Sequence, residues 1–187
     1  MRVIGGELRG RRLESPPGDT ARPTSDRVRE AVFNILTSLG AVDGSTVLDL
    51  FAGTGALGIE ALSRGATHAT FVERDPKLLA PLRRNLDSLG LDDDATVVTG
   101  DAGRYARDAV STGQRFDLAF LDPPYAFDAW DDLLADLPAA LVVIESDRPI
   151  TTSEAWGVLR EKRYGGTLVT VARREPTAST GPSGPVA

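Results

Sequence analysis

The sequence contains no cysteine, and His68 is its one histidine among 187 residues. Without a thiol, the chain has no disulfide, no thiolate metal ligand and no cysteine nucleophile. This argues against cytosine C5 methylation, which needs such a nucleophile. A single histidine does not support a zinc site either. We therefore expect no metal, and we interpret His68, which precedes an apolar strand, as a surface residue.

Long apolar runs are also missing. No stretch approaches the ~18 apolar residues of a membrane-spanning helix, and the first seven residues lack the apolar core of a signal peptide. We therefore expect a cytoplasmic protein with no membrane partner. A length of 187 residues, with 41% hydrophobic and 26% charged residues, fits one globular domain. We expect this domain to be a monomer.

The net charge of -6 is unevenly distributed. Residues 1–29 hold seven arginines and four acidic residues, a net charge of +3, which leaves -9 for the rest of the chain. An acidic protein is a poor general binder of nucleic acid, but a basic arm on an acidic body can contact phosphates locally. The alternative is a solvated arm with scattered arginines. We define residues 1–23 as this basic N-terminal arm.

Strand and helix patterns alternate after the arm, whose residues 3–14 suggest a strand pair or an extended segment. A helix is expected from Thr24, which Thr24 or Ser25 can cap, to Gly40. The further expected helices cover 56–64, 75–90 (with Pro81 bending it), 102–110 and 128–137. The expected strands cover 46–50, 67–73, 95–99, 116–121, 140–145, 157–164 and 167–174. This alternation predicts an α/β fold over residues 24–174, with a mostly parallel seven-stranded sheet and an antiparallel C-terminal hairpin. Residues 175–187 are rich in Pro, Gly, Ser and Thr, and we expect them to be a disordered tail.

A glycine-rich turn follows the first expected strand. The segment from Gly53 to Gly58 fits the pattern G-x-G-x-x-G, and Glu73 ends the next strand twenty positions after Gly53. Glycines let the backbone approach a ligand, the next helix N-terminus faces it, and the acid can accept from both ribose hydroxyls. Adenosine cofactors share this pattern. By itself it does not separate NAD from S-adenosylmethionine.

Two further acidic residues favour S-adenosylmethionine. Asp49 ends the first strand, where a carboxylate can meet the cationic amino group of this cofactor. Asp101 follows the third strand, where it can accept from the adenine amine. Either residue alone would be interpreted as a helix cap or a solvated side chain. The expected cofactor-binding residues are Asp49, Phe51, Ala52, Gly53, Thr54, Gly55, Gly58, Glu73, Asp101, Ala102 and Asp122.

The motif Asp122-Pro123-Pro124-Tyr125 follows the fourth strand. An exocyclic base amine is a weak nucleophile, because its lone pair is delocalised into the ring. The Asp122 carboxylate and the Pro123 carbonyl can accept hydrogen bonds from the N–H groups of this amine. The carboxylate also offsets the positive charge that develops on nitrogen. Tyr125 offers a stacking face worth about 1–3 kcal/mol per base, and the prolines fix the turn. We expect Asp122, Pro123, Pro124 and Tyr125 to be the catalytic residues of a methyltransferase acting on an exocyclic amine.

Together these residues resemble the bacterial 16S rRNA guanine-N2 methyltransferases of the RsmD type, over roughly residues 2–175. The glycine turn and Asp-Pro-Pro-Tyr are common to many amino-methyltransferases, whereas the arm and the Arg-Pro-Thr helix start are the specific part. The segments that carry the resemblance are residues 2–6, 9–13, 22–30, 33–34, 49–58, 60–66, 122–125 and 164–165. The resemblance implies a Rossmann-like class I S-adenosylmethionine-dependent methyltransferase fold.

The resemblance also implies methyl transfer to N2 of one guanine in 16S rRNA, with the small ribosomal subunit as partner. It implies that the arm and the start of the first helix lie near the RNA or the mouth of the active site. Because the chain is acidic overall, RNA affinity would then depend on the arm. The substrate-binding residues expected on this basis are Arg9, Arg11, Arg12, Arg22, Thr24, Arg27 and Tyr125.

Other functions remain open from the sequence alone. An adenine-N6 DNA methyltransferase could use the same turn, although the chain has no evident target-recognition domain. An N-methyltransferase acting on a protein or a small molecule would not need the basic arm. A non-catalytic RNA chaperone or ribosome assembly factor would bind the small subunit without methylating it, and a dehydrogenase would bind NAD.

Overall fold

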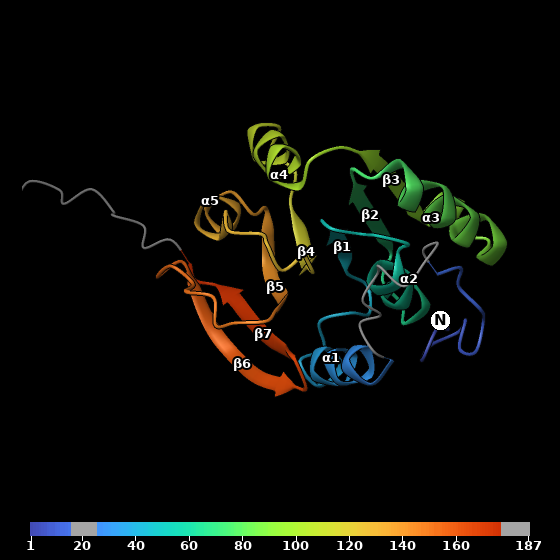
Figure 1. Cartoon of the computed structure of the whole chain (residues 1–187), viewed down its shortest axis with the longest axis horizontal. Helices are drawn as coiled ribbons and strands as arrows, with labels where there is room; N and C mark the ends of the chain where they lie inside the picture. Colours follow the sequence, from blue (N-terminus) through green and yellow to red (C-terminus); the bar gives the residue numbers. More distant parts are fainter. Residues whose placement is uncertain (16–25, 177–187) are drawn as a thin grey trace, which may run out of the picture.

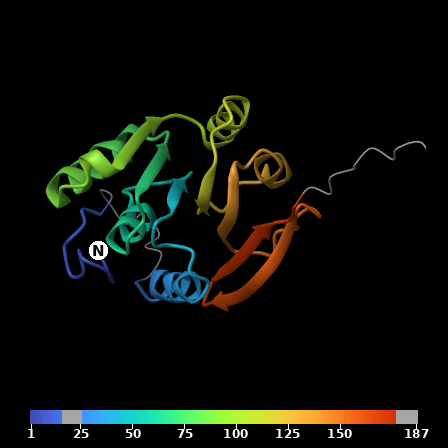
Figure 2. The same ribbon diagram turned by 180° about the vertical axis from the view of Figure 1, so that it is seen from behind.

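The computed structural model describes residues 1–15 and 26–176. Within these ranges seven strands form one sheet in the order β3-β2-β1-β4-β5-β7-β6 (Figures 1 and 2). The strands are β1 (Thr46–Asp49), β2 (His68–Glu73), β3 (Ala95–Thr99), β4 (Phe116–Leu121), β5 (Ala139–Ser146), β6 (Trp156–Tyr164) and β7 (Thr167–Arg174). The first five are parallel, and β7 pairs antiparallel with both β5 and β6. This confirms the expected α/β fold, mostly parallel sheet and C-terminal hairpin.

Helices cover both faces of the sheet (Figure 1). They are α1 (Asp26–Ser38), α2 (Ala56–Ser63), α3 (Pro76–Leu89), α4 (Ala102–Ser111) and α5 (Trp130–Ala135), with a short 3₁₀ turn, η1 (Asp92–Asp94), that the sequence did not predict. Side chains of α1, α2 and α3 share one buried cluster with the arm, and those of α4 and α5 share another. Three helices therefore pack on one face and two on the other.

The observed helix ends follow from local sequence. The Asp75 side chain accepts from the Lys77 backbone amide at 2.9 Å, Pro76 stands at the first helical position, and Gly90 ends α3 with a φ of +70°. The helix continues through Pro81, which is buried. His68 lies at the start of β2, where its Nε2 is 2.9 Å from the Thr96 hydroxyl.

The N-terminal residues form a narrow antiparallel pair. The Val3 amide donates to the Arg11 carbonyl at 3.0 Å, and Arg2 pairs with Arg12 in a single bridge. The strand-pair alternative for the arm is thus confirmed over residues 1–15. Residues 16–23 of the arm, the predicted helix start at Thr24 or Ser25, and residues 177–187 of the predicted tail lie outside the described residues.

The core extends to the edge of the sheet where the parallel strands end. The Phe33 ring of α1 lies 5.6 Å from the Phe120 ring of β4, and both side chains are fully buried. Each such side chain contributes about 1.5–3 kcal/mol of burial free energy. This packing supports the strand ends that follow. In the described part of the chain, no helix combines the length and apolar character that crossing a membrane requires.

Candidate functional site

The glycine turn and the Asp-Pro-Pro-Tyr turn lie side by side at the carboxyl edge of the sheet. Strands β1 and β4 are neighbours, and the Leu50 amide donates to the Phe120 carbonyl at 3.1 Å. Just beyond, the Phe51 ring contacts the Phe127 ring edge to face, with 5.3 Å between centroids. Ligands of open α/β sheets bind at such strand ends. The structure therefore brings the two predicted motifs into one site.

Close packing requires two glycines of the first turn, Gly55 and Gly58. Gly55 has a φ of +88°, and a Cβ built on it would lie 2.4 Å from Cδ1 of Leu82. A Cβ on Gly58 would lie 2.2 Å from the Phe71 ring, so this glycine lets α2 pack directly on β2. Both positions exclude a side chain.

Three carboxylates gather at this edge, at the ends of β1, β2 and β4. Asp49 is buried and accepts from the Gly58 amide at 3.0 Å. Burial raises the pKa of Asp49 to about 7; the Gly58 amide lowers it, and the negative charges of Asp122 and Glu73 raise it further. Asp122 and Glu73 are thus each close enough to disfavour the charge on Asp49, and a cation at this edge would relieve the repulsion.

Glu73 links the second strand to the glycine turn. Its Oε2 accepts from the Gly53 amide at 2.8 Å, and its Oε1 accepts from the Asp75 amide at 2.7 Å. A carboxylate has about four lone-pair positions. Two amides therefore leave acceptor capacity for the ribose contacts that the sequence predicted, which remain a prediction.

Backbone amides around the turn already donate within the protein. These are the amides of Gly53, Gly55 and Gly58. Their acceptors are the Glu73 carboxylate, the Ala52 carbonyl at 2.7 Å and the Asp49 carboxylate. A dinucleotide fold normally directs such amides and a helix N-terminus at a diphosphate. Here these amides are engaged and the surrounding charge is negative, so the turn is poorly suited to an anion.

Asp101 forms the N-cap of α4. Its Oδ1 accepts from the Arg104 amide at 3.0 Å, and the side chain is exposed, whereas the neighbouring Ala102 is buried. The helix-cap interpretation of Asp101 is confirmed. Its predicted contact with an adenine amine remains a prediction.

The Asp-Pro-Pro-Tyr turn is partly exposed. Pro123 is buried, Asp122 is half-buried, and Pro124 and Tyr125 are exposed. The Phe127 amide donates to the Pro124 carbonyl at 2.8 Å and closes the turn. The Tyr125 ring is therefore accessible, and the contacts of this turn with a planar amine remain a prediction.

An arginine that was not predicted from the sequence holds this turn. Arg148 follows β5 and donates to the Tyr125 carbonyl at 3.1 Å and to the Phe127 carbonyl at 3.0 Å. Asp147 pairs with the same guanidinium at 3.1 Å. Because the acceptors are backbone atoms more than 20 residues away, no local motif marks Arg148.

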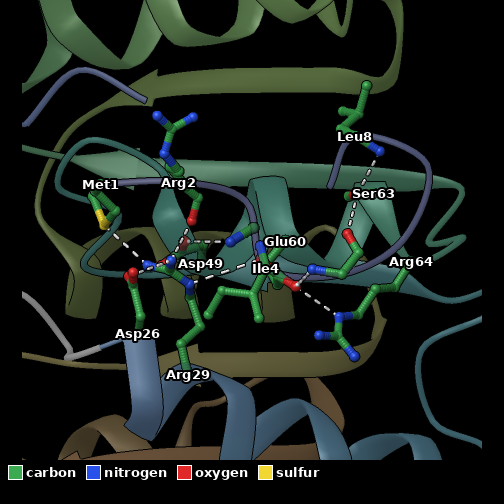
Figure 3. Close-up of polar contacts among 12 residues, drawn as sticks. Met1, Arg2, Ile4, Leu8, Asp26, Arg29, Asp49, Glu60, Ser63 and Arg64 are labelled. Carbon is green, nitrogen blue, oxygen red and sulfur yellow. Dashed lines mark hydrogen bonds and ion pairs between the residues drawn. The ribbon is translucent and has the colours of Figure 1, made fainter. Parts of the chain in front are cut away.

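The arm is docked on the body through α2 (Figure 3). The two oxygens of the buried Glu60 accept from the Ile4 and Gly5 amides at 2.7 and 2.8 Å. Ser63 accepts from the Leu8 amide at 3.0 Å and donates to the Gly5 carbonyl at 2.6 Å. The first part of the arm is therefore held by specific hydrogen bonds to one face of a helix.

Two arginines flank Glu60 (Figure 3). The Arg64 Nε lies 2.7 Å from one carboxylate oxygen and the fully buried Arg29 Nε lies 3.8 Å from the other. Arg29 also donates to the Arg2 carbonyl and to Asp26. Burial lowers the pKa of Arg29, which the charges of Glu60 and Asp26 partly offset. A buried acid between two arginines had no recognisable sequence signal, because an acid on a helix is usually solvated.

Asn85 of α3 connects the end of the arm to the glycine turn. Its Oδ1 accepts from the Glu14 amide at 2.7 Å, and its Nδ2 donates to the Thr54 carbonyl at 2.9 Å. The side chain is buried. No sequence pattern indicated this residue either, since both partners are distant in sequence.

The predicted substrate-binding residues that the structure describes come from the arm, from α1 and from the Asp-Pro-Pro-Tyr turn. Arg11 donates to the Ser88 carbonyl at 2.7 Å, at the end of α3, whereas Arg9 and Arg12 of the arm and Arg27 of α1 are exposed. Tyr125 stands at the sheet edge, as described above. The remaining two, Arg22 and Thr24, lie outside the described residues.

Comparison with known proteins identifies relatives over nearly the whole chain. A family model described as "Conserved hypothetical protein 95" matches residues 1–173. The ribosomal RNA small subunit methyltransferase D of Haemophilus influenzae is 36% identical over 174 residues, covering 88% of this chain and 89% of the relative. The protein of the same name from Escherichia coli K12 is 37% identical over 185 residues, covering 94% and 90%.

Two solved structures have the same fold as this chain over most of its length. The Escherichia coli protein yhhF superposes with a TM-score of 0.81 at 35% identity, covering 95% of this chain and 99% of that one. A hypothetical protein of Thermus thermophilus gives a TM-score of 0.79 at 32% identity, covering 92% and 99%.

Proposed function

The chain belongs to the family of the ribosomal RNA small subunit methyltransferase D proteins, and on this premise we propose its reaction. It transfers a methyl group from S-adenosylmethionine to an exocyclic amine of ribosomal RNA. The acceptor is N2 of a guanine in 16S rRNA, within the small ribosomal subunit. The observation that carries the proposal is the contact of an acid-lined glycine turn with the Asp-Pro-Pro-Tyr turn at one sheet edge.

The charge of the site supports S-adenosylmethionine as the cofactor. Asp49, Glu73 and Asp122 present negative charge where the cofactor has a sulfonium and an ammonium group, while NAD would bring a diphosphate. Glu73 would hold the ribose, and Asp101 with the buried Ala102 would face the adenine. Phe51 and Ala52, which precede Gly53, would line the cofactor site. When bound, the cofactor supplies an electrophilic methyl group and leaves as the neutral thioether.

Asp122, Pro123 and Tyr125 would orient the acceptor. Stacking on Tyr125 holds the flipped base, at a gain of about 1–3 kcal/mol that offsets the few kcal/mol needed to unstack it. The Asp122 carboxylate and the Pro123 carbonyl accept hydrogen bonds from the amine and direct the nitrogen lone pair towards the methyl group. As the nitrogen–methyl bond forms, the carbon–sulfur bond breaks and its electron pair stays on sulfur. The nitrogen then loses one proton, and we assign Asp122 as the group that accepts it.

The substrate assignment draws support from the relatives and from the resemblance. Proteins 36–37% identical over most of their length are named small subunit ribosomal RNA methyltransferases. The guanine N2 position comes from the resemblance of the arm and the Arg-Pro-Thr helix start to the guanine-N2 enzymes. Positioning is the main source of acceleration in such a site, worth about 7–11 kcal/mol in well-oriented systems.

Nucleoside mass spectrometry tests the proposal. Small subunits that lack the modification are incubated with the protein and S-adenosylmethionine, and the digested rRNA is compared with that from an Asp122→Ala reaction. We expect N2-methylguanosine with the intact protein alone. A methylated adenine would support the adenine-N6 alternative.

Two further controls separate the remaining alternatives. Transfer to protein or to a small molecule without any nucleic acid would contradict the RNA assignment. Binding to the small subunit by both proteins, with no methyl group transferred, would favour a non-catalytic assembly factor.

A further inference from the structure

The C-terminal hairpin is strongly basic in an acidic protein. Residues 156–174 contain five basic side chains and one acidic side chain, a net charge of +4 in a chain of net charge -6. Residues 1–15 of the arm contain four arginines and two glutamates, a net charge of +2. The hairpin thus has a larger excess of positive charge than the described part of the arm, for which the sequence predicted RNA binding.

Two of these charges lie in a row with a tyrosine on one face of the outermost strand. β6 is the last strand of the sheet and pairs with β7 alone. Arg160 and Lys162 stand opposite Val171 and Val169, which face the side of the sheet that α1 covers. Alternate residues of a strand share a face and lie about 6.5–7 Å apart. We call Arg160, Lys162 and Tyr164 the β6 stripe.

The end of the β6 stripe approaches the candidate active site. The Lys162 ammonium lies 5.3 Å from the Tyr164 ring centroid, and Tyr164 begins the hairpin turn. A Cβ built on Gly166 in that turn would lie 4.0 Å from the Tyr125 hydroxyl. The hairpin turn therefore stands next to the ring that we assign to the target base.

We propose that the β6 stripe binds the phosphate backbone of the RNA strand that flanks the target nucleotide. This inference rests on the proposed function, and it adds a docking surface that neither the sequence motifs nor the relatives' names indicate. Cations spaced along an extended strand suit successive phosphates, and the adjacent tyrosine suits a base. Because the chain outside the hairpin has a net negative charge, a polyanion that reaches Tyr125 meets attraction along this strand.

Exposed cations on a sheet edge also have a purely protective explanation. Lysine and arginine discourage edge-to-edge pairing of strands between molecules. In that case their removal would promote self-association and leave RNA affinity unchanged. The two explanations therefore predict different measurements.

The test compares two variants with the same loss of charge. Arg160→Gln with Lys162→Gln removes two positive charges from the β6 stripe. Arg107→Gln with Arg115→Gln removes two exposed charges, one from α4 and one from the residue that precedes β4. The affinity for 16S rRNA and for small subunits is measured between about 50 and 200 mM salt, a range over which phosphate contacts weaken strongly. KM and kcat for methyl transfer are measured on the same proteins.

The slope of log affinity against log salt is negative. For the β6 variant we expect its magnitude to decrease by about 1.5–2, as for two lost phosphate contacts. KM for the RNA should rise roughly tenfold, with kcat at saturation and cofactor affinity within about twofold of the unchanged protein. The control variant should keep the original slope and KM. Equal slopes and KM values in the β6 variant and the unchanged protein would overturn the proposal, and so would an equal loss in the control.

This experiment separates the two proposals. If the β6 variant loses the expected part of the salt dependence of RNA binding but the unchanged protein transfers no methyl group to RNA, the proposed function fails and the β6 stripe stands. If transfer to rRNA occurs and the β6 variant is unaffected, the stripe alone fails.

Discussion

Arg148 donates a hydrogen bond to the backbone carbonyl of Tyr125 at 3.1 Å. A second bond from the same guanidinium reaches the Phe127 carbonyl at 3.0 Å. One planar side chain thus spans both carbonyls of the turn that presents the candidate stacking ring. Because Phe127 also contacts Phe51 of the glycine turn, this brace connects the two halves of the site.

Replacing Arg148 should therefore impair transfer more than folding. Lysine keeps the charge but cannot span both carbonyls, so we expect Arg148→Lys and Arg148→Gln to lower kcat/KM for rRNA roughly tenfold, given about 1.5 kcal/mol for a hydrogen bond to a charged donor. The melting temperature should change little, because the guanidinium is partly exposed. Steady-state kinetics with Arg115→Gln as the control provide the check. Unchanged kcat/KM in both variants would show that the turn does not depend on the hydrogen bonds from Arg148.

Asp49 should make cofactor binding release a proton below neutral pH. Its pKa is raised to about 7, mainly by burial, so at about pH 6 most molecules hold it protonated. A bound ammonium or sulfonium favours the ionised form, and the proton then leaves for the buffer. Calorimetric binding enthalpy at this pH should depend on the ionisation enthalpy of the buffer, and Asp49→Asn should remove this dependence. The same dependence in both proteins would assign the proton to another group.

The same group sets a pH dependence of stability. The folded-state pKa of about 7 exceeds the unfolded value of 3.8, so the folded protein binds more protons between these values. The contribution of Asp49 to the free energy of unfolding therefore falls as pH rises from about 4 to 7 and is constant above. As the pH rises from about 5 to about 8, the free energy of unfolding measured in urea should fall less for Asp49→Asn than for the unchanged protein. An identical loss would mean that Asp49 is already ionised at the lower pH.

Glu60 should be a main anchor of the arm. Glu60→Gln removes a buried negative charge between Arg29 and Arg64 and sets an amide nitrogen against a backbone N–H, which should cost about 3 kcal/mol of unfolding free energy. Glu7→Gln, in the exposed part of the arm, should change it by less than about 0.5 kcal/mol. Urea denaturation measures both. Similar small changes would show that the arm is held by its apolar contacts alone.

Asn85 should transmit the position of the arm to the cofactor. Asn85→Asp replaces the amide that donates to the Thr54 carbonyl with an oxygen, so the glycine turn loses a support and gains a repulsion. We expect cofactor affinity to fall about tenfold or more, while the exposed Asp87→Asn on the same helix leaves it unchanged. Direct titration of the cofactor distinguishes these results. If Asn85→Asp binds as tightly as the unchanged protein, the turn does not depend on this link.

The sequence predicted the architecture well, because turn residues mark most element ends. The bounds of β3 and β4 match the prediction, and Pro76 with Gly90 frames α3. The side-by-side position of the two motifs also followed, since parallel strands end at a common edge. The insertion of β7 between β5 and β6 was not predicted, because periodicity does not encode strand order.

The supports of the site were harder to find from sequence. Arg148, Asn85 and Glu60 each bind backbone atoms of distant segments, and backbone partners leave no pattern in the side chains. Asp101 shows the opposite case, since the cap that its position allowed is present in the structure. Residues whose partners are local could thus be predicted, and residues that join remote segments could not.

The most direct test of the central claim is the single-turnover rate of methyl transfer to small subunits, measured for the unchanged protein and for Asp122→Asn at saturating S-adenosylmethionine. Cofactor affinity is measured for both proteins, so that loss of binding is not mistaken for loss of chemistry. We predict a rate about 100-fold lower or more in the variant at a cofactor concentration that saturates both proteins. A variant rate close to that of the unchanged protein would contradict the assignment of Asp122 and of the Asp-Pro-Pro-Tyr turn as the reacting site.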